Sequence, residues 1–364
     1  MIVNSHNEWD PLEEVIIGDG FPESLPLLEY SFKLFFHDNI SSKDYLFGDQ
    51  TISKRHIEEH SEDLERFVEL LESLNVIVQR PKIPKKLYKI KTPAWDSVIH
   101  PALNVRDMAM VIGNTIIETP PTLRYRYFEN YLLNHLFLDY FKQGCKWIQA
   151  PKPIMTDNSF DLSYIDEVSG ETFCLNNFKP SSHELDCGIE IMFDAANCVR
   201  MGTHILVNVA NDNQRLGVDW LRGVLGDNYT IWETSIADSH IDSSFLPLRP
   251  GLGLVMKPYV RESLPKPLQK WDLIHIPMRD RSQNQMDSQG IKLASPRIEL
   301  NVLSVSPNLI ICHPEYEKVL NERLKRYKIE AIGTPFRHCE IFSGAHHCTS
   351  LDVRRSGELE NYFS

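Results

Sequence analysis

SEDLERFVELLESLNVIVQRP, residues 61–81, places a helical pattern directly before a β-rich run. Apolar residues recur at helical spacing on one face, as Leu64, Phe67, Val68, Leu71 and Leu74. This period is typical of an amphipathic helix packed against a core. Val76-Ile77-Val78 follows and Pro81 closes it, while Val15-Ile16-Ile17 supplies a β-rich run upstream. The segment therefore predicts a module of strand, helix and strand.

The same order of elements recurs four more times along the chain. The predicted strand, helix and strand lie at 108–117, 127–141 and 147–148; at 205–209, 220–225 and 229–232; at 252–256, 264–268 and 273–276; and at 309–311, 315–327 and 329–332. Five such modules favour a closed, radially repeated α/β architecture. An open α/β sheet has the same element order, so the pattern alone leaves both folds open. The polar segment 160–186 is interpreted as an insertion or lid.

Length and composition exclude several classes of protein. With 364 residues and 42% hydrophobic content, the chain can bury a large core as one big domain or two small ones. A formal net charge of -12 disfavours nucleic acid or an anionic membrane as partner, because either would repel the surface. Neither a targeting segment nor a stretch of membrane-spanning length is visible. Seven cysteines without a Cys-x-x-Cys pair fit reduced thiols, so we expect a cytoplasmic protein.

Short motifs for nucleotides and metals give little support. No Gly-rich dinucleotide or phosphate-binding motif is present. His56-Ile57-Glu58-Glu59-His60 matches a zinc peptidase order, but its charged surroundings favour a solvated helix face. His338-Cys339 and His346-His347-Cys348 are too tightly spaced to be typical zinc ligands. We therefore expect no metal ion.

A more informative set of polar residues is spread along the second half of the chain. It comprises Phe193-Asp194-Ala195-Ala196-Asn197, Ser239-His240-Ile241-Asp242-Ser243 and Gly344-Ala345-His346-His347-Cys348. These supply a thiol, an imidazole and carboxylates, the groups that a thiol enzyme needs. In an extended conformation His240 and Asp242 point to the same face of a strand and can meet one ligand. A polar strand end with an ion pair is the alternative that the residues alone leave open.

Together with motifs elsewhere, these stretches resemble the arginine amidinotransferases, within the superfamily of guanidino-group-modifying enzymes. The matching motifs are residues 7–18 (NEWDPLEEVIIG), 91–93 (KTP), 106–107 (RD), 150–153 (APKP), 193–196 (FDAA), Cys348 and 352–355 (DVRR). The resemblance covers nearly the whole chain in fixed order. It implies a five-bladed α/β propeller of pseudo-five-fold strand-helix modules, formed as a single domain over residues 1–364.

The resemblance also implies a role for individual residues in a reaction without metal or organic cofactor. Cys348 matches the nucleophile, His240 the general acid/base and Asp194 the carboxylate that orients the histidine. Carboxylates can hold a planar guanidinium by charge-assisted hydrogen bonds and orient its carbon toward sulfur. The expected reaction is ping-pong, because an amidino group would be carried covalently on Cys348 between release of L-ornithine and arrival of an amine.

Four further positions match residues that hold L-arginine: Asp107, Asp242, Arg261 and Ser295. Two departures from the family pattern stand close to this site. The usual three glycines and an aromatic before the His-Cys pair are replaced by Ser343-Gly344-Ala345-His346, and Ala294 stands where a second serine is common. Loop conformation and acceptor fit are therefore expected to differ.

The identity of the amine acceptor stays open at this point. We expect an amino acid such as lysine or glycine, within toxin or antibiotic biosynthesis, and an aminocyclitol phosphate is the alternative. A deiminase that uses water, and a catalytically silent arginine-binding protein, are the other hypotheses. Relatives suggest a homodimer.

Overall fold

The computed structural model describes residues 2–20, 29–35, 51–86, 88–163, 180–237, 240–277 and 299–363. Ser295, a predicted arginine-binding residue, lies outside these ranges, as does most of the segment 160–186 interpreted as an insertion or lid. The described parts of that segment, 160–163 and 180–186, contain no helix or strand.

Among the described residues the strands form five three-stranded sheets and one separate hairpin, β3 (Tyr88–Lys91) with β4 (Asp96–Ile99). The first sheet joins the two ends of the chain, with strands β17 (Ser350–Arg355), β1 (Leu12–Ile17) and β2 (Ile77–Gln79). The other four are β5 (Ala109–Ile112), β6 (Thr115–Glu118) and β7 (Lys146–Gln149); β8 (Cys198–Met201), β9 (His204–Asn208) and β10 (Thr230–Thr234); β11 (Phe245–Arg249), β12 (Leu252–Val255) and β13 (Asp272–His275); and β14 (Leu303–Ser306), β15 (Leu309–Cys312) and β16 (Glu330–Gly333).

All five sheets share one topology. The first strand pairs antiparallel with the middle strand, and the middle strand pairs parallel with the third. In the first sheet β17 plays the part of the first strand, so the C-terminal strand closes the ring of modules against β1. The predicted five-fold α/β propeller is confirmed, and the open sheet is excluded.

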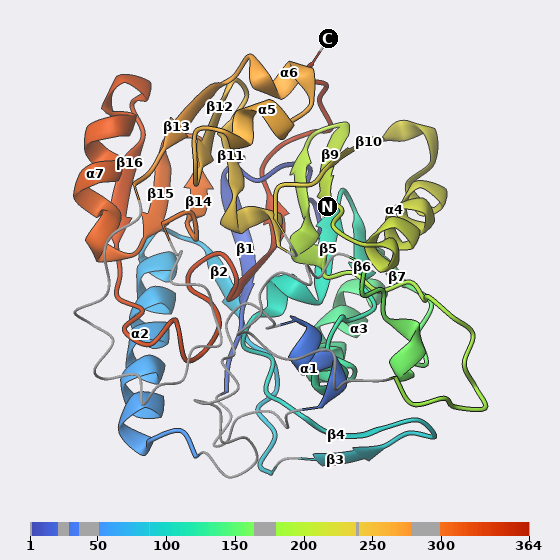
Figure 1. Ribbon diagram of the computed structural model, residues 1–364. Helices are drawn as coiled ribbons and strands as arrows, with labels where there is room; N and C mark the ends of the chain where they lie inside the picture. Colours follow the sequence, from blue (N-terminus) through green and yellow to red (C-terminus); the bar gives the residue numbers. More distant parts are fainter. Residues whose placement is uncertain are drawn as a thin grey trace.

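Helices connect the middle strand of a module to its third strand and lie outside the strands (Figure 1). They are α2 (Lys54–Ser73), α3 (Asn134–Lys142), α4 (Asp212–Leu225), the short pair α5 (Val260–Ser263) and α6 (Lys266–Gln269), and α7 (Pro314–Leu324). A further short helix, α1 (Tyr30–Phe35), lies within the first module's long connection. The predicted helix 127–141 is too long, because residues 129–132 form a separate 3-10 turn before α3 begins.

Local sequence explains where these helices start and stop. Side chains of Ser53 and Asn211 accept hydrogen bonds from the third residue inside α2 and α4, so each satisfies a backbone donor that the helix cannot. Asn75 and Gly226 end the same two helices with positive φ of 63° and 61°, a conformation that asparagine and glycine adopt at low cost. After Asn75 the chain enters β2 within two residues, whereas after α4 a 3-10 turn at Gly226–Asn228 precedes β10.

The α2 histidines correct one prediction. His56 and His60 are buried and therefore do not lie on a solvated face. The ring of His56 packs against that of His338, with centroids 4.5 Å apart, and that of His60 stacks on Phe342. The described residues contain no group of three or more side chains placed to hold a metal ion. Within the described chain no helix combines the length and apolar character needed to cross a bilayer.

Buried charges tie the N-terminal segment to three modules. Arg200 donates to both Glu8 and Asp352, and Arg106 bridges the same two carboxylates from another module. Arg355 adds a third guanidinium to Asp352, at 2.8 Å. These five side chains are all less than 9% exposed, so their charges depend on one another for compensation.

Candidate active site

The predicted catalytic residues stand at equivalent places in different modules. Each lies in the segment that enters the first strand of a sheet: Asp107 precedes β5, Asp194 precedes β8, His240 and Asp242 precede β11, and Cys348 precedes β17. Because the five sheets share one topology, these segments meet at one end of the propeller axis. The fifth module contributes Asn301, which precedes β14.

His240 is held between carboxylates from two other modules. Its Nε2 lies 2.9 Å from Oδ2 of Asp194, and its Nδ1 lies 3.7 Å from Oδ1 of Asp107. Asp194 is itself fixed by Thr122, whose backbone N–H and hydroxyl donate to it. Burial by itself would lower the pKa of His240, but Asp107, Asp194 and Asp242 together raise this pKa to about 9. The imidazole is therefore protonated at neutral pH and donates to Asp194.

Cys348 lies in a tight turn and is 7% exposed. Asn301 clamps this turn: its Nδ2 donates to Sγ of Cys348 at 2.8 Å, while its Oδ1 accepts from the backbone N–H groups of His347 and Cys348. Burial and the nearby Asp242 and Asp107 raise the thiol pKa well above its usual value, and the Asn301 hydrogen bond partly offsets them. The isolated site therefore holds a neutral thiol.

Each of the two carboxylates predicted to bind a guanidinium already makes a short hydrogen bond with another side chain, in addition to the longer contact between Asp107 and His240. Oδ2 of Asp107 accepts from Arg126 at 2.6 Å, and Oδ2 of Asp242 lies 2.6 Å from Nδ1 of His347. Arg126 also forms a double hydrogen bond with Glu129. Oδ1 of Asp107 is buried and makes no hydrogen bond within the described residues, so it can accept from a ligand.

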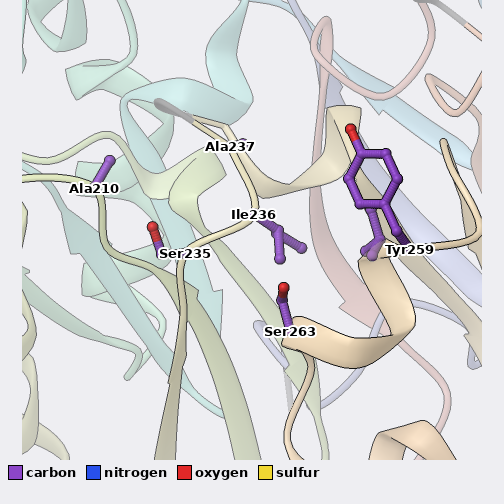
Figure 2. A pocket seen from close by; sticks show the side chains of 7 residues that line it. Ala210, Ser235, Ile236, Ala237, Tyr259 and Ser263 are labelled. Carbon is purple, nitrogen blue, oxygen red and sulfur yellow. The ribbon is translucent and has the colours of Figure 1, made fainter. Parts of the chain in front are cut away.

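Arg261 is not brought to this cluster. It lies on α5, and its guanidinium donates to the backbone carbonyls of Gln269 and Trp271. Figure 2 shows a pocket of about 310 Å³ beside this helix, with Ser235 and Ile236 from the segment after β10 and Tyr259 and Ser263 from the α5 region. No charged side chain is among the described residues that line it.

Sequence reasoning missed several residues that the structure places at the site. Asn301 belongs to no motif, and the strand that it precedes, β14, was not predicted, so no sequence signal marked it. Asn104, Arg126 and Glu129 also lie against His240 and Asp107, around a cavity of about 70 Å³. Arg126 directly precedes the predicted helix 127–141 and Glu129 falls within it, and neither position gave an indication of a site.

Two solved structures match the whole chain. An inosamine-phosphate amidinotransferase from Streptomyces griseus superposes with a TM-score of 0.82 at 31% sequence identity, covering 100% of this chain and 99% of that one. An amidinotransferase of the saxitoxin biosynthetic pathway from Microseira wollei gives 0.79 at 33% identity, with both chains covered completely. A dimethylarginine dimethylaminohydrolase matches at 0.55 and 13% identity, which shows a shared fold alone.

Relatives of known activity match over the same length. The L-arginine:L-lysine amidinotransferase of Pseudomonas savastanoi pv. phaseolicola is 30% identical, over 99% of this chain and 96% of its own. The mitochondrial glycine amidinotransferase of Xenopus tropicalis is 30% identical over 100% of this chain and 85% of its own. No family model matches the chain. With this identity sustained from end to end, on a propeller that superposes on two amidinotransferases, the chain belongs to the amidinotransferase family and is an amidinotransferase enzyme.

Proposed function

We propose that the enzyme takes the amidino group of L-arginine onto Cys348, releases L-ornithine, and passes the group to an amine. The observation that carries this proposal is the meeting of one thiol, one protonated imidazole and carboxylates at the same end of the axis. Cys348, His240 and Asp194 would be the catalytic residues, and Asp107 and Asp242 would hold the guanidinium.

The first half-reaction needs a thiolate, which the raised pKa of Cys348 disfavours in the empty site. A guanidinium placed at Oδ1 of Asp107 would offset the carboxylate charges that raise this pKa, so that the thiol releases its proton to solvent. The sulfur then attacks the guanidinium carbon and forms a C–S bond. The C–N bond to the ornithine part breaks, and protonated His240 supplies a proton to the departing nitrogen.

In the second half-reaction the incoming amine attacks the same carbon. The amine nitrogen gives its proton to His240, which the first step has left neutral, and the C–S bond breaks to restore the thiolate. The same imidazole thus serves as acid and then as base, and Asp194 keeps its ring in place through both steps. The scheme consumes no metal, oxidant or reductant.

For the acceptor we propose an amino acid such as lysine or glycine, in a specialised biosynthetic pathway of the toxin or antibiotic type. The relatives above carry three acceptors in their names, L-lysine, glycine and inosamine phosphate, so the family alone does not choose. The net charge of -12 disfavours a phosphorylated acceptor. The one arginine among the described residues of the small cavity, Arg126, is already engaged by Asp107 and Glu129.

Three further expectations remain proposals. Arg261 would have to leave the carbonyls of Gln269 and Trp271 to bind the carboxylate of L-arginine. Ser295 would hold the amino-acid part of the ligand. We also propose a cytoplasmic homodimer, and the free thiols of all the described cysteines agree with a reducing compartment.

Mass spectrometry of the intact protein after brief exposure to L-arginine tests the proposal. We expect wild type to gain the mass of one amidino group with release of ornithine, and Cys348→Ala to gain none. Adding candidate amines should then discharge the adduct, and the amine that does so fastest identifies the acceptor class. No adduct, or citrulline formed without any amine, would reject transfer and favour a hydrolase.

A further inference from the structure

Unsatisfied acceptors line the small cavity beside His240. Oδ1 of Asn104 and Oδ1 of Asp107 are buried and make no hydrogen bond within the described part of the chain, although the second lies 3.7 Å from Nδ1 of His240. Their residues are at most 9% exposed. A buried acceptor without a partner costs about 1–3 kcal/mol, so the arrangement indicates a ligand that brings N–H donors.

The orientation of the Asn104 amide is fixed by its own donors. Nδ2 of Asn104 donates to the backbone carbonyls of Phe342 and Ser343, at 3.1 and 3.2 Å. A flipped amide would set its oxygen against those two carbonyl oxygens, and repulsion excludes that arrangement. The side-chain oxygen therefore points away from the carbonyl groups of residues 342 and 343, and it accepts no hydrogen bond within the described residues.

Asn104 also lies beside the nucleophile. A side chain built on Gly344 would place its first carbon 2.4 Å from Oδ1 of Asn104 and 2.7 Å from Cβ of Cys348. Both atoms therefore border the small space beside Gly344, which is open because glycine has no side chain. Asn104 precedes the 3-10 turn Val105–Asp107, so the same short segment carries both Asn104 and Asp107.

The cations among the described residues of the cavity are already paired with carboxylates: protonated His240 lies 2.9 Å from Asp194 and 3.7 Å from Asp107. Arg126 donates to Asp107, to Glu129 and to the backbone carbonyl of Asn104, and burial together with Arg126 lowers the pKa of His100 to about 4, which leaves that ring neutral. A planar cation with several N–H groups fits such a surface. An amide at position 104 adds an acceptor without adding a third negative charge close to the thiol.

We infer that Asn104 is a substrate-binding residue whose side-chain oxygen accepts a hydrogen bond from the amidino group, both in L-arginine and while the group is bound to Cys348. This inference rests on the proposed function. It assigns to Asn104 a contact that complements Asp107: the carboxylate attracts the cation, and the amide fixes the rotation of its plane.

The test compares Asn104→Leu with wild type by two independent rates. The first rate is that of amidino-adduct formation from L-arginine, measured by rapid quenching and mass spectrometry. In Asn104→Leu this rate should fall by roughly 10- to 100-fold, as expected for one lost hydrogen bond to a charged group. Alkylation of Cys348 by iodoacetamide, read on its own peptide, should stay within about two-fold. Asn114→Leu is the matched control, because Asn114 anchors the carbonyl of Gly144 away from the site.

The two rates separate the possible outcomes. Unchanged adduct formation in Asn104→Leu would overturn the assignment. Equal loss of adduct formation and of alkylation would also overturn it, since Asn104 would then act only by anchoring residues 342–343. If wild type itself forms no adduct while iodoacetamide still labels Cys348, the proposed function has failed, and the assignment fails with it.

Discussion

At the scale of single residues, the site keeps its nucleophile and its acid in protonated forms until a substrate arrives. The thiol of Cys348 is buried beside two carboxylates, which raise its pKa, and the same carboxylates hold a proton on His240. A guanidinium bound at Asp107 would lower the pKa of the Cys348 thiol, because it offsets the negative charge of a carboxylate that raises this pKa. Adduct formation should therefore couple cation binding to thiolate formation.

His240 sets the alkaline limit of the reaction. Since its pKa is raised to about 9, the acid form is present at neutral pH and is lost as pH rises through about 9. We expect the rate of adduct formation in wild type to fall over that range. Asp194→Asn removes one of the charges that raise this pKa, so the falling limb should move down by about one pH unit or more.

Quenched-reaction mass spectrometry across pH 6 to 10 would measure, in both proteins, the pH at which the rate of adduct formation falls. Asp139→Asn serves as control, because Asp139 is exposed on α3 and forms an ion pair with the exposed Lys142. If the rate of adduct formation falls at the same pH in Asp194→Asn and in wild type, Asp194 does not control the proton on His240.

Asn301 should control how easily Cys348 loses its proton. Asn301→Ala removes the Nδ2 donor from Sγ, so the thiol pKa should rise and alkylation by iodoacetamide at pH 8 should slow by roughly tenfold. Asn301→Asp keeps an acceptor for the backbone N–H groups but brings a negative charge to the sulfur, and should be slower still. A full pH profile of alkylation separates a shifted pKa from a blocked thiol, and an unshifted profile in Asn301→Ala would contradict the role.

At the scale of elements, the turn before β17 depends on a missing side chain. A Cβ at Gly344 would overlap both Asn104 and Cys348. We therefore expect Gly344→Ala to displace the nucleophile and slow adduct formation by about 100-fold. Gly223→Ala is the control: it lies in α4, where a Cβ meets nothing within 4 Å, and should raise the helix stability by about 0.5–1 kcal/mol. Normal adduct formation in Gly344→Ala would show that the turn can accommodate a Cβ without displacing Cys348.

The sequence predicted some elements of each module better than others. Middle strands such as β9 and third strands such as β10 were found, because they are apolar runs that flank a helix. First strands such as β8 (CVRM) and β14 (LSVS) were missed, since they are four residues long and mix polar with apolar side chains. The helical histidines were misplaced for a related reason: charged neighbours hid the buried face of His56 and His60.

The weak sequence signal of the first strands also limited the prediction of the site. Cys348, His240, Asp194 and Asp107 each precede a first strand, and hydrophobic period missed several of these strands. The resemblance to a family supplied Cys348, His240 and Asp194, and the structure brings them to one place. Asn301 and Asn104 could not be found in that way, because each acts through contacts with segments far away in the sequence.

At the scale of the whole molecule, a ring of five small sheets needs something to hold its modules in register. The closing pair of β1 and β17 joins the two ends of the chain, and the buried charges around Asp352 join the second and third modules to them. This charge cluster also touches the site, because Nε2 of His347 lies 3.9 Å from Glu8, while its Nδ1 pairs with Asp242. The position of the nucleophile therefore depends on the closure of the ring.

Glu8 tests that dependence. Burial by itself would raise the pKa of Glu8, but Arg200 and His347 hold it well below its usual 4.5. Its contribution to the free energy of unfolding is thus complete above pH 4.5 and is lost as pH falls below that value toward the folded-state pKa. Glu8→Gln leaves Arg200 and Arg106 without one of their carboxylates, so we expect a loss of about 3–5 kcal/mol at pH 7.

Urea unfolding at pH 7 and at pH 3.5 would measure both effects in wild type, Glu8→Gln and the control Glu330→Gln, whose carboxyl is exposed on β16. Because glutamine cannot titrate, the difference between wild type and Glu8→Gln should narrow at pH 3.5. A difference that is the same at both values would mean that the lost packing of the variant, and not the charge of Glu8, destabilises the ring.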